Sequence, residues 1–325
     1  MNISICITTF NEEKSIAKLL DSLLDQTLKA SEVIIVDGGS TDKTVEIIRH
    51  YQKKDNRIKL LVEKCSRAKG RNIGIDIAKN EIIAVTDAGC VAHKDWLEKL
   101  IEPFKLPEVD PQHQKVGVGV DISAGFYRMT GRNPVSKAMA IFLGVLPSKF
   151  DINFLPSTRS MAFRKNVWEE IGGFPDESKN SAEDTYFNYS ALKLGMKYAR
   201  VKNALVEWGM PETVGQFMSK IKDYAKWDAK TKIFNFPKKG LMSHNIKSLS
   251  IFLRYIVLLA LLVFSFATPY LFAYFLIFLF AYFIWSFRKV FLQFREVKIA
   301  LWGPVLQVTS DFAVMAGFLA GILGR

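Results

Sequence analysis

The chain has 325 residues, enough for one large domain or two smaller ones, and 44 Lys and Arg against 32 Asp and Glu give it a formal net charge of +12. This basic balance suits an anionic membrane surface or phosphorylated substrates. No Lys- and Arg-rich run with interleaved aromatic residues occurs, so nucleic acid is excluded as an expected partner. Three cysteines without metal-ligand spacing exclude a disulfide framework and predict a reducing compartment.

The first 90 residues alternate strand and helix patterns. Apolar runs at 3–7 and 33–36 predict buried strands, and each is followed by a polar turn and a helical pattern. Continuous apolar strands followed by helices indicate an α/β fold with a sheet covered on both faces. In such sheets, ligands bind in the crevice beyond the carboxyl ends of the strands.

The turn after the second strand carries two acids, Asp37 and Asp42, in the sequence VDGGSTD. A carboxylate at that edge can accept hydrogen bonds from the N–H groups of a base or from ribose hydroxyls. The alternative is that this turn only caps the following helix.

Further motifs follow in a fixed order. The first strand ends in TTFNEE at 8–13, RNIG stands at 71–74, and the apolar run 82–85 ends in TDAG at 86–89. A GGF turn at 172–174 then precedes SAEDTY at 181–186. This order of motifs resembles the family-2 inverting glycosyltransferases with the GT-A fold, over roughly residues 1–235. The resemblance implies a mixed sheet flanked by helices that binds a nucleotide sugar.

The resemblance assigns the donor-binding residues. Arg71 is chemically suited to this role, because its guanidinium can pair with phosphate oxygens, although a surface charge on a helix is the alternative. The nucleotide-sugar site implied by the resemblance consists of Thr8, Asn11, Glu12, Asp37, Asp42, Arg71, Asn72 and Asp87.

Asp87 is also the expected ligand of a divalent metal, Mn²⁺ or Mg²⁺. The family pattern at this strand end is Asp-x-Asp, but here it is Asp87-Ala88-Gly89, so the second carboxylate is missing. A hard cation prefers oxygen ligands, and Mg²⁺ often binds by one or two carboxylates plus substrate phosphates. One aspartate plus the diphosphate can therefore suffice.

The resemblance makes Asp184 the general base that removes the proton of the acceptor hydroxyl, with Glu183 orienting the acceptor. The alternative for this pair is an acidic first turn that favours the helix dipole. Polymer-making members usually carry a Gln-x-x-Arg-Trp element, whose nearest equivalent here is the pair Lys226 and Trp227. This pair is expected near the diphosphate or acceptor, unless Trp227 only packs.

The character of the chain changes after residue 250. Apolar runs at 251–267, 270–287 and 301–323 predict three membrane helices, separated by a Thr268-Pro269 turn and by a basic stretch at 288–298. The positive-inside rule places the catalytic domain and 288–298 in the cytoplasm, and the 268–269 tip and Arg325 outside. The rival interpretation is that the first two runs form one re-entrant or monotopic hairpin. Asp311, inside the third run, is expected to contact other helices, a lipid head group or Arg254.

The sequence thus predicts a cytosolic GT-A domain at 1–235, a juxtamembrane linker at 236–250 and an α-helical membrane region at 251–325 in a multi-pass protein of the cell membrane. The expected activity is transfer of a single sugar from a nucleotide sugar, by preference UDP-linked, to a lipid-linked acceptor, among membrane lipids. A processive polysaccharide synthase and a non-catalytic nucleotide-binding membrane scaffold are the alternatives. The oligomeric state is left open.

Overall fold

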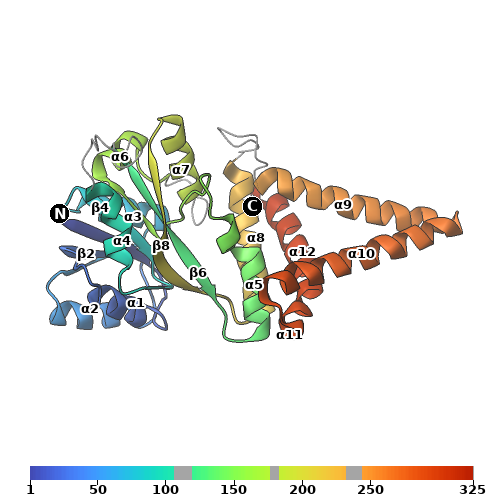
Figure 1. Ribbon diagram of the computed structural model, residues 1–325, viewed down its shortest axis with the longest axis horizontal. Helices are drawn as coiled ribbons and strands as arrows, with labels where there is room; N and C mark the ends of the chain where they lie inside the picture. The colour runs from blue at the N-terminus through green and yellow to red at the C-terminus, as the bar shows by residue number, and fades with distance from the viewer. Residues whose placement is uncertain (106–118, 176–182, 232–243, 325) are drawn as a thin grey trace, which may run out of the picture. The chain divides into compact units, whose positions relative to one another are not determined.

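The computed structural model describes residues 1–105, 119–175, 183–231 and 244–324 (Figure 1). These residues form two compact units, one made of Met1–Arg128 and Pro147–Gly209 and the other of Met129–Leu146 and Met210–Arg325. Residues 129–146 and 210–231 therefore group with the C-terminal helices, and the domain boundary predicted at residue 235 stays a prediction. Most of the expected 236–250 linker precedes His244 and lies outside the described residues.

The first unit is built on an eight-stranded sheet with the strand order β3-β2-β1-β4-β7-β6-β8-β5. The strands are β1 (Ile3–Thr9), β2 (Glu32–Asp37), β3 (Ile58–Val62), β4 (Ile82–Asp87), β5 (Cys90–Ala92), β6 (Ile122–Thr130), β7 (Met161–Arg164) and β8 (Tyr198–Gly209). β1 to β4 pair in parallel, whereas β7 pairs antiparallel with both β4 and β6. The predicted mixed α/β sheet flanked by helices is thus confirmed.

Helices cover this sheet because each presents an apolar stripe to it. In α1, the buried residues Ile16, Leu19, Leu20 and Leu23 recur at helical spacing. The helices of the unit are α1 (Ile16–Leu24), α2 (Thr44–Lys54), α3 (Arg67–Asp76), α4 (Trp96–Lys105), α6 (Lys165–Ile171) and α7 (Glu183–Lys193), with a 3₁₀ turn at Pro147–Lys149.

Helix α3 approaches the sheet closely because it carries glycines on its inner face. A Cβ atom at Gly70 would lie 3.3 Å from Thr8 Cγ2, and one at Gly74 would lie 3.4 Å from Val36 Cγ2. Ser66 caps the helix, its hydroxyl accepting a 3.1 Å hydrogen bond from the Lys69 N–H. This close packing fixes the position of Arg71 one turn into the helix.

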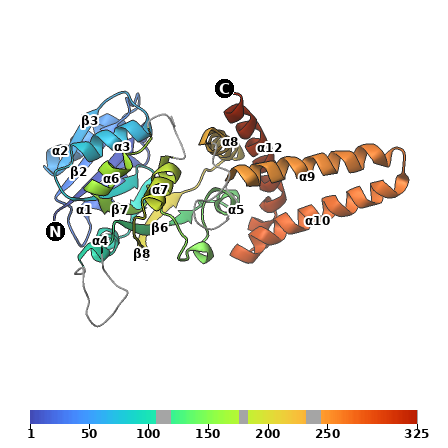
Figure 2. The same cartoon turned by 90° about the horizontal axis from the view of Figure 1, so that it is seen from above.

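Among the described residues, the second unit consists mainly of helices. It contains α5 (Pro134–Leu143), α8 (Val214–Thr231), α9 (His244–Ser265), α10 (Pro269–Phe294), α11 (Val297–Ala300) and α12 (Trp302–Ile322). Figure 2 shows α9 and α10 as an antiparallel hairpin. The segments His244–Ser265, Tyr270–Phe294 and Val297–Ile322 are long and apolar enough to cross a membrane, as the sequence predicted.

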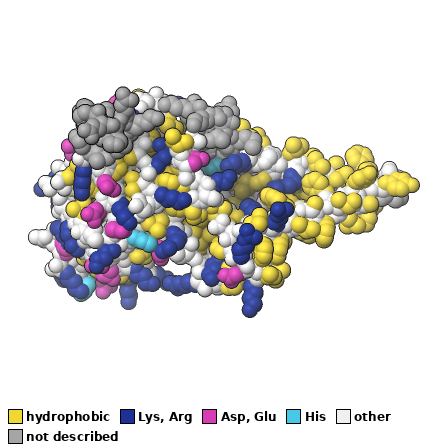
Figure 3. Space-filling model, viewed as in Figure 1, with side chains coloured by type: hydrophobic (Ala, Val, Ile, Leu, Met, Phe, Trp, Pro, Cys, Tyr) yellow, Lys and Arg dark blue, Asp and Glu magenta, His cyan; other side chains and the backbone are white. Residues whose placement is uncertain are grey.

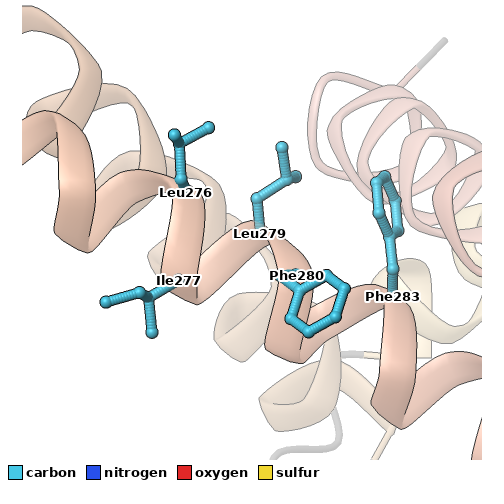
Figure 4. Close-up of a pocket in the computed structure, with 5 residues that line it drawn as sticks. All are labelled: Leu276, Ile277, Leu279, Phe280 and Phe283. Carbon is cyan, nitrogen blue, oxygen red and sulfur yellow. The ribbon is translucent and has the colours of Figure 1, made fainter.

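Apolar side chains dominate the surface of the hairpin. Figure 3 shows them covering its visible face, while Lys and Arg side chains gather over the part of the unit from which it projects. Figure 4 shows an open apolar groove along α10, lined by Leu276, Ile277, Leu279, Phe280 and Phe283.

One buried acid ties the three long apolar helices together. Asp311 on α12 is only 1% exposed, and its Oδ2 accepts a 2.9 Å hydrogen bond from Arg254 Nη2 on α9 and another from the Tyr282 hydroxyl on α10. Gln307 Nε2 donates to Asp311 Oδ1 at 3.0 Å. The expected contact between Asp311 and Arg254 is confirmed, since a charge among apolar helices needs a counter-charge.

In the first unit, a buried acid has a similar role at the start of β2. Glu32 accepts hydrogen bonds from the Ser4 hydroxyl on β1 at 2.6 Å, from the Lys79 N–H at 2.8 Å and from the Lys59 ammonium on β3. Burial raises the pKa of Glu32, but the hydrogen bonds from Lys59, Ser4 and Lys79 outweigh it and hold that pKa below its ordinary value.

We predict that Glu32→Gln lowers the free energy of unfolding by about 1–3 kcal/mol at neutral pH, because Lys59 loses its counter-charge. A carboxyl group whose pKa is lowered in the folded state stabilises the fold at pH values above its ordinary pKa. This contribution is lost as the pH falls through the lowered pKa. The difference between variant and wild type should therefore shrink below about pH 4. Thermal melts in detergent across pH check this, with Glu102→Gln, on an exposed face of α4, as the control. A difference that does not shrink at all as the pH falls below the ordinary carboxyl pKa would contradict the ionic explanation.

Candidate active site

The polar motifs meet at one edge of the sheet because the parallel strands end there together. In register, Thr9 of β1 pairs with Asp37 of β2, and Thr8 of β1 pairs with Asp87 of β4. The sequence prediction that Asp37 and Asp87 share the carboxyl edge thus follows from the strand order β2-β1-β4.

The loop after β1 and the turn after β2 are joined by hydrogen bonds. Asn11 adopts a positive φ of 54°, and its side-chain oxygen accepts a 2.9 Å bond from the Thr41 N–H. The Glu12 N–H donates to Thr44 Oγ1 at 2.7 Å, and the Glu13 N–H donates to Asp42 Oδ2 at 3.1 Å. Asn11, Glu12 and Asp42 thus hold the two segments together as one rim of the edge.

Asp37 lies beneath this rim and is fully buried. Its Oδ1 accepts hydrogen bonds from the N–H groups of Gly39 at 3.0 Å and Ser40 at 2.8 Å, and its Oδ2 accepts one from the Ser40 hydroxyl at 2.6 Å. Its carboxylate therefore shapes the turn at residues 37–40. Phe10, which sequence reasoning did not single out, projects from the same rim and is 59% exposed.

Arg71 links the two acidic motifs. Its Nη1 donates to Glu183 Oε1 at 3.1 Å and its Nη2 donates to Asp87 Oδ1 at 3.2 Å, while the guanidinium lies 5.1 Å from the ring centroid of Phe174. Its side chain is only 2% exposed. Both ends of the guanidinium thus bind protein carboxylates, and Arg71 holds these two acids in place.

Asn72, the next residue, also has a positioning role. Its Nδ2 donates to the Phe174 carbonyl at 2.7 Å, and its Oδ1 accepts from the Phe174 N–H at 2.8 Å and from the Trp168 indole at 3.1 Å. The side chain therefore holds the glycine turn at 172–174, whose Gly172 and Gly173 have φ values of 83° and 80°.

Asp87 is the most heavily paired acid of the edge. Besides Arg71, its Oδ1 accepts a 3.1 Å hydrogen bond from the Thr158 hydroxyl, and its Oδ2 lies 3.9 Å from Arg159 Nε. Burial raises the pKa of Asp87, but the positive charges of Arg71, Arg159 and Arg67 and the Thr158 hydrogen bond outweigh it and lower that pKa. Asp87 is therefore ionised throughout the physiological range.

Two further arginines, which sequence reasoning missed, complete the cluster. The Arg159 guanidinium stacks on Trp208, 3.7 Å from the ring centroid, and lies 5.3 Å from that of Tyr127. Arg67 Nη1 lies 3.8 Å from Glu183 Oε1. Arg67 is the first residue of the helix that carries Arg71, and this position could have indicated that it belongs to the same cluster. Nothing in the local sequence around Arg159 marks it as a partner of Asp87.

Asp184 follows Glu183 in the first turn of α7 and differs from Glu183 and Asp87 in its hydrogen bonding and its pKa. Among the described residues, its carboxylate has no hydrogen-bond donor. Burial, followed by the negative charge of Glu183, raises the pKa of Asp184 to about 6, against the lowering effects of Arg159 and Arg71. A carboxylate poised near neutral pH can accept a proton from a substrate, whereas Asp87 cannot.

The remaining candidates, Lys226 and Trp227, lie on α8, which belongs to the second unit. The Lys226 ammonium is 5.6 Å and the Lys230 ammonium 4.5 Å from the ring centroid of Trp227.

A metal at this edge would depend on Asp87. Within the described ranges, no three His, Cys, Asp or Glu side chains come together in a way that could hold a metal ion. Asp87 Oδ2 makes only a longer 3.9 Å ion pair, so this oxygen can still face a cation. One carboxylate fits Mg²⁺ or a similar cation only if phosphate oxygens and water supply the other ligands.

Comparisons with known proteins agree with this geometry. Residues 4–172 match glycosyl transferase family 2. The glycosyltransferase AglE of Haloferax volcanii is 28% identical over 181 residues, which cover 54% of this chain and 56% of that protein. A dolichyl N-acetyl-α-D-glucosaminyl phosphate 3-β-D-2,3-diacetamido-2,3-dideoxy-β-D-glucuronosyltransferase of Methanococcus voltae is 33% identical over 145 residues, 41% of this chain and 45% of that protein. The chain thus matches about half the length of these two relatives.

Among solved structures, the mannosyltransferase PcManGT of Pyrobaculum calidifontis, in complex with GDP-Man and Mn²⁺, has a similar fold. It superposes with a TM-score of 0.59 at 19% identity, covering 100% of this chain and 88% of the other. The family match covers more than half of the chain and includes the strand ends that carry Asp37 and Asp87. The chain therefore belongs to glycosyl transferase family 2.

Proposed function

We propose that this protein transfers a single sugar from a nucleotide sugar, preferably a UDP-sugar, to a lipid-linked acceptor with inversion at the anomeric carbon. The observation that carries the proposal is the difference between two acids of one cluster. Asp87 is held ionised by arginines, whereas the pKa of Asp184 is raised to about 6. Pairs of acids with pKa values pushed apart are typical of sites where one group transfers a proton and another supports charge.

In the proposed reaction, Asp184 accepts the proton of the acceptor hydroxyl as the acceptor oxygen bonds to the anomeric carbon. The bond from that carbon to the diphosphate oxygen breaks, and its electron pair leaves with the diphosphate. An α-linked donor then gives a β-linked product. Arg159 and Arg67, whose side chains are more exposed than that of Arg71, are suited to offset the growing negative charge.

The donor nucleoside is proposed to bind along the rim formed by Thr8, Asn11, Glu12, Asp37 and Asp42. Since the Asp37 carboxylate is occupied by the turn, we assign the contacts with base and ribose mainly to the rim's other polar groups. Exposed Phe10 offers an aromatic face to a base. Asn72 and Arg71 would act indirectly, by holding the turn at 172–174 and the acids.

A divalent metal, Mn²⁺ or Mg²⁺, is proposed to bind Asp87 Oδ2 together with the diphosphate. When bound, such an ion supplies positive charge to the leaving group. The protein's own arginines already supply part of that charge, which offsets the absence of the second acid of an Asp-x-Asp pattern.

The lipid-linked acceptor is supported by two observations. Three helices are apolar enough to enter a membrane, and a relative acts on a dolichyl-phosphate-linked sugar, as its name states. We further propose that the catalytic unit faces the cytoplasm and that the protein acts in building cell-envelope glycans. A processive synthase remains the second candidate, and product length separates the two. Lys226 and Trp227 remain candidate contacts for acceptor or diphosphate.

The first experiment incubates the purified full-length protein in nanodiscs with a panel of nucleotide sugars, Mn²⁺ or Mg²⁺ and a lipid extract, and identifies lipid products by mass spectrometry. We expect a mass gain of one sugar unit with a single donor. A ladder of masses would favour a polymerase. Nucleotide binding without any product would favour a non-catalytic scaffold.

Asp184→Asn should lower the transfer rate by about 10²- to 10⁴-fold with an unchanged KM for the donor, since only the proton acceptor is removed. Because the pKa of Asp184 is raised in the folded state, ionising this carboxyl group lowers the free energy of unfolding. The full loss of stability is reached only at pH values above the raised pKa. The variant should therefore melt at a higher temperature than wild type above about pH 6, and at the same temperature near pH 4. Asp76→Asn on exposed α3 is the matched control, and equal loss in both variants would contradict the assignment.

The pH profile tests the same group. Because Asp184 must be deprotonated, kcat/KM should rise with pH and level off above about pH 6. Glu183→Gln removes the neighbouring negative charge, so the rising limb should move to lower pH. Rates measured across pH for both proteins check this, and an unmoved limb would show that another group titrates.

Asp87→Asn should raise the metal concentration needed for half-maximal rate by at least about tenfold, because it removes the proposed protein ligand. Titration of metal into chelator-treated wild type and variant measures this. A lower maximal rate with unchanged metal dependence would leave Asp87 only its role of holding Arg71.

A further inference from the structure

Helix α7 carries an asparagine in its interior whose side chain is buried. Asn188 lies one turn after Asp184 and is only 2% exposed. Asparagine is a poor helix former, and burying its amide is costly unless the amide is hydrogen-bonded. An asparagine at this position is therefore explained by the partners of its side chain.

Both hydrogens of the Asn188 amide are engaged. Its Nδ2 donates to the Asp184 carbonyl at 2.7 Å and to the Pro156 carbonyl at 2.8 Å. Its Oδ1 accepts a 3.0 Å hydrogen bond from the Tyr198 hydroxyl on β8. An ionised aspartate of the same shape would offer no donor to the two carbonyls, so the site is specific for an amide.

The two carbonyls belong to segments that hold different acids of the cluster. Asp184 is the proposed proton acceptor, whereas Pro156 stands just before Thr158 and Arg159. Thr158 donates to Asp87 Oδ1 at 3.1 Å, and Arg159 Nε lies 3.9 Å from Asp87 Oδ2. The Asn188 amide thus joins the start of α7 to the segment that pairs with Asp87.

This amide and the Arg71 guanidinium form two separate bridges across the cluster. Arg71 joins Asp87 to Glu183 by charged hydrogen bonds. Asn188 joins the residue after Glu183 to the segment whose Thr158 binds Asp87. The first bridge neutralises charge, whereas the second is neutral and fixes only position.

The position of these segments determines the charges that surround Asp184. Burial and the charge of Glu183 raise the pKa of Asp184 to about 6, and the positive charge of Arg159 partly offsets this rise. The effect of Arg159 depends on its distance from Asp184. Loosening the bridge between the two segments should weaken this effect, so the pKa of Asp184 should rise further.

Tyr198 keeps the Asn188 amide in its orientation. Burial raises the pKa of the Tyr198 hydroxyl above its ordinary value, although the charge of Arg200 acts in the opposite direction. The hydroxyl is therefore protonated at neutral pH and donates to Asn188 Oδ1. A flipped amide would direct its oxygen at two carbonyl oxygens, which also favours the observed orientation.

We propose that Asn188 is a positioning residue, which fixes the distance between Asp184 and Arg159. The inference rests on the proposed role of Asp184 as proton acceptor. Because Asn188 acts through backbone carbonyls, its loss should slow the transfer step and displace the titration of Asp184 without weakening donor binding.

Asn188→Ser tests the bridge in the full-length protein in nanodiscs. A serine hydroxyl can still donate to the carbonyl four residues earlier, but it is too short to bind the Pro156 carbonyl as well. The melting temperature of each protein is compared across pH with that of its Asp184→Asn counterpart. The difference stops growing above the folded-state pKa of Asp184.

We expect this plateau to begin about one pH unit higher in Asn188→Ser than in wild type, because Arg159 lowers the pKa of Asp184 less. An unmoved plateau would overturn the proposal. Tyr198→Phe, which removes only the hydroxyl bound to Asn188 Oδ1, is the milder second variant. It should move the plateau in the same direction by a smaller amount, and it decides the question if Asn188→Ser does not fold.

Glu32→Gln is the matched control for stability. Glu32 starts β2, at the end of the strand opposite to Asp37 and the carboxyl edge. This variant should lower the melting temperature without moving the titration of Asp184. If Asn188→Ser behaved in the same way as this control, Asn188 would only stabilise the fold and the proposal would be wrong.

A double substitution measures whether the effect passes through Arg159. Arg159→Gln alone should raise the plateau at least as much as Asn188→Ser does. Combining the two substitutions should add little further, since both remove the same interaction. Fully additive shifts would show that Asn188 acts independently of Arg159, contrary to the proposal.

Kinetic measurements connect the bridge to sugar transfer. Asn188→Ser should lower kcat about 10- to 100-fold with a nearly unchanged KM for the donor, since it displaces the proton acceptor. The rising limb of kcat/KM should move to higher pH together with the plateau. A raised KM with unchanged kcat would contradict a positioning role. Absence of product from wild type would refute the proposed function alone, because the titration of Asp184 is measured without turnover.

Discussion

The first unit depends on one buried cation. The Arg71 guanidinium, 2% exposed, joins Asp87 at the end of β4 to Glu183 at the start of α7, two segments far apart in the chain. Without it, two acids would remain buried without their main counter-charge, which is strongly destabilising. The glycines of α3 allow the helix to come close enough to the sheet for this contact, so backbone packing and electrostatics determine the site together.

The same cluster separates the properties of its acids. Asp87 pairs with Arg71 and Arg159, and Glu183 accepts from Arg71 and pairs with Arg67. Asp184 lies beside this pair with no donor among the described residues, so it experiences burial and the charge of Glu183 without full compensation. The same cluster thus contains one acid, Asp87, suited to holding a cation close by, and another, Asp184, suited to accepting a proton. This division of roles is the physical basis of the proposed reaction.

A related constraint shapes the helical unit. Asp311 is tolerated among apolar helices because Arg254, Tyr282 and Gln307 surround it, and this network fixes the base of the hairpin. Apolar content alone makes α12 resemble a spanning helix. The close contacts of Gly317 with the Lys222 carbonyl and of Gly321 with the Lys226 carbonyl pack α12 directly on α8.

Residue types and their spacing were enough to predict the local pattern: buried strands followed by helices, the acids at the strand ends, the apolar C-terminal runs and the family resemblance. Those features depend on residue type and short-range spacing, so they can be read from the amino-acid sequence alone. Only the tertiary structure decided the partners. It showed that Arg71 binds Asp87 and Glu183 and that Asn72 binds the Phe174 backbone. It also brought Arg159, just before β7, close to Asp87 and packed α12 against α8. Such contacts join residues tens of positions apart, and their energies depend on burial and neighbouring charge, which no local pattern contains.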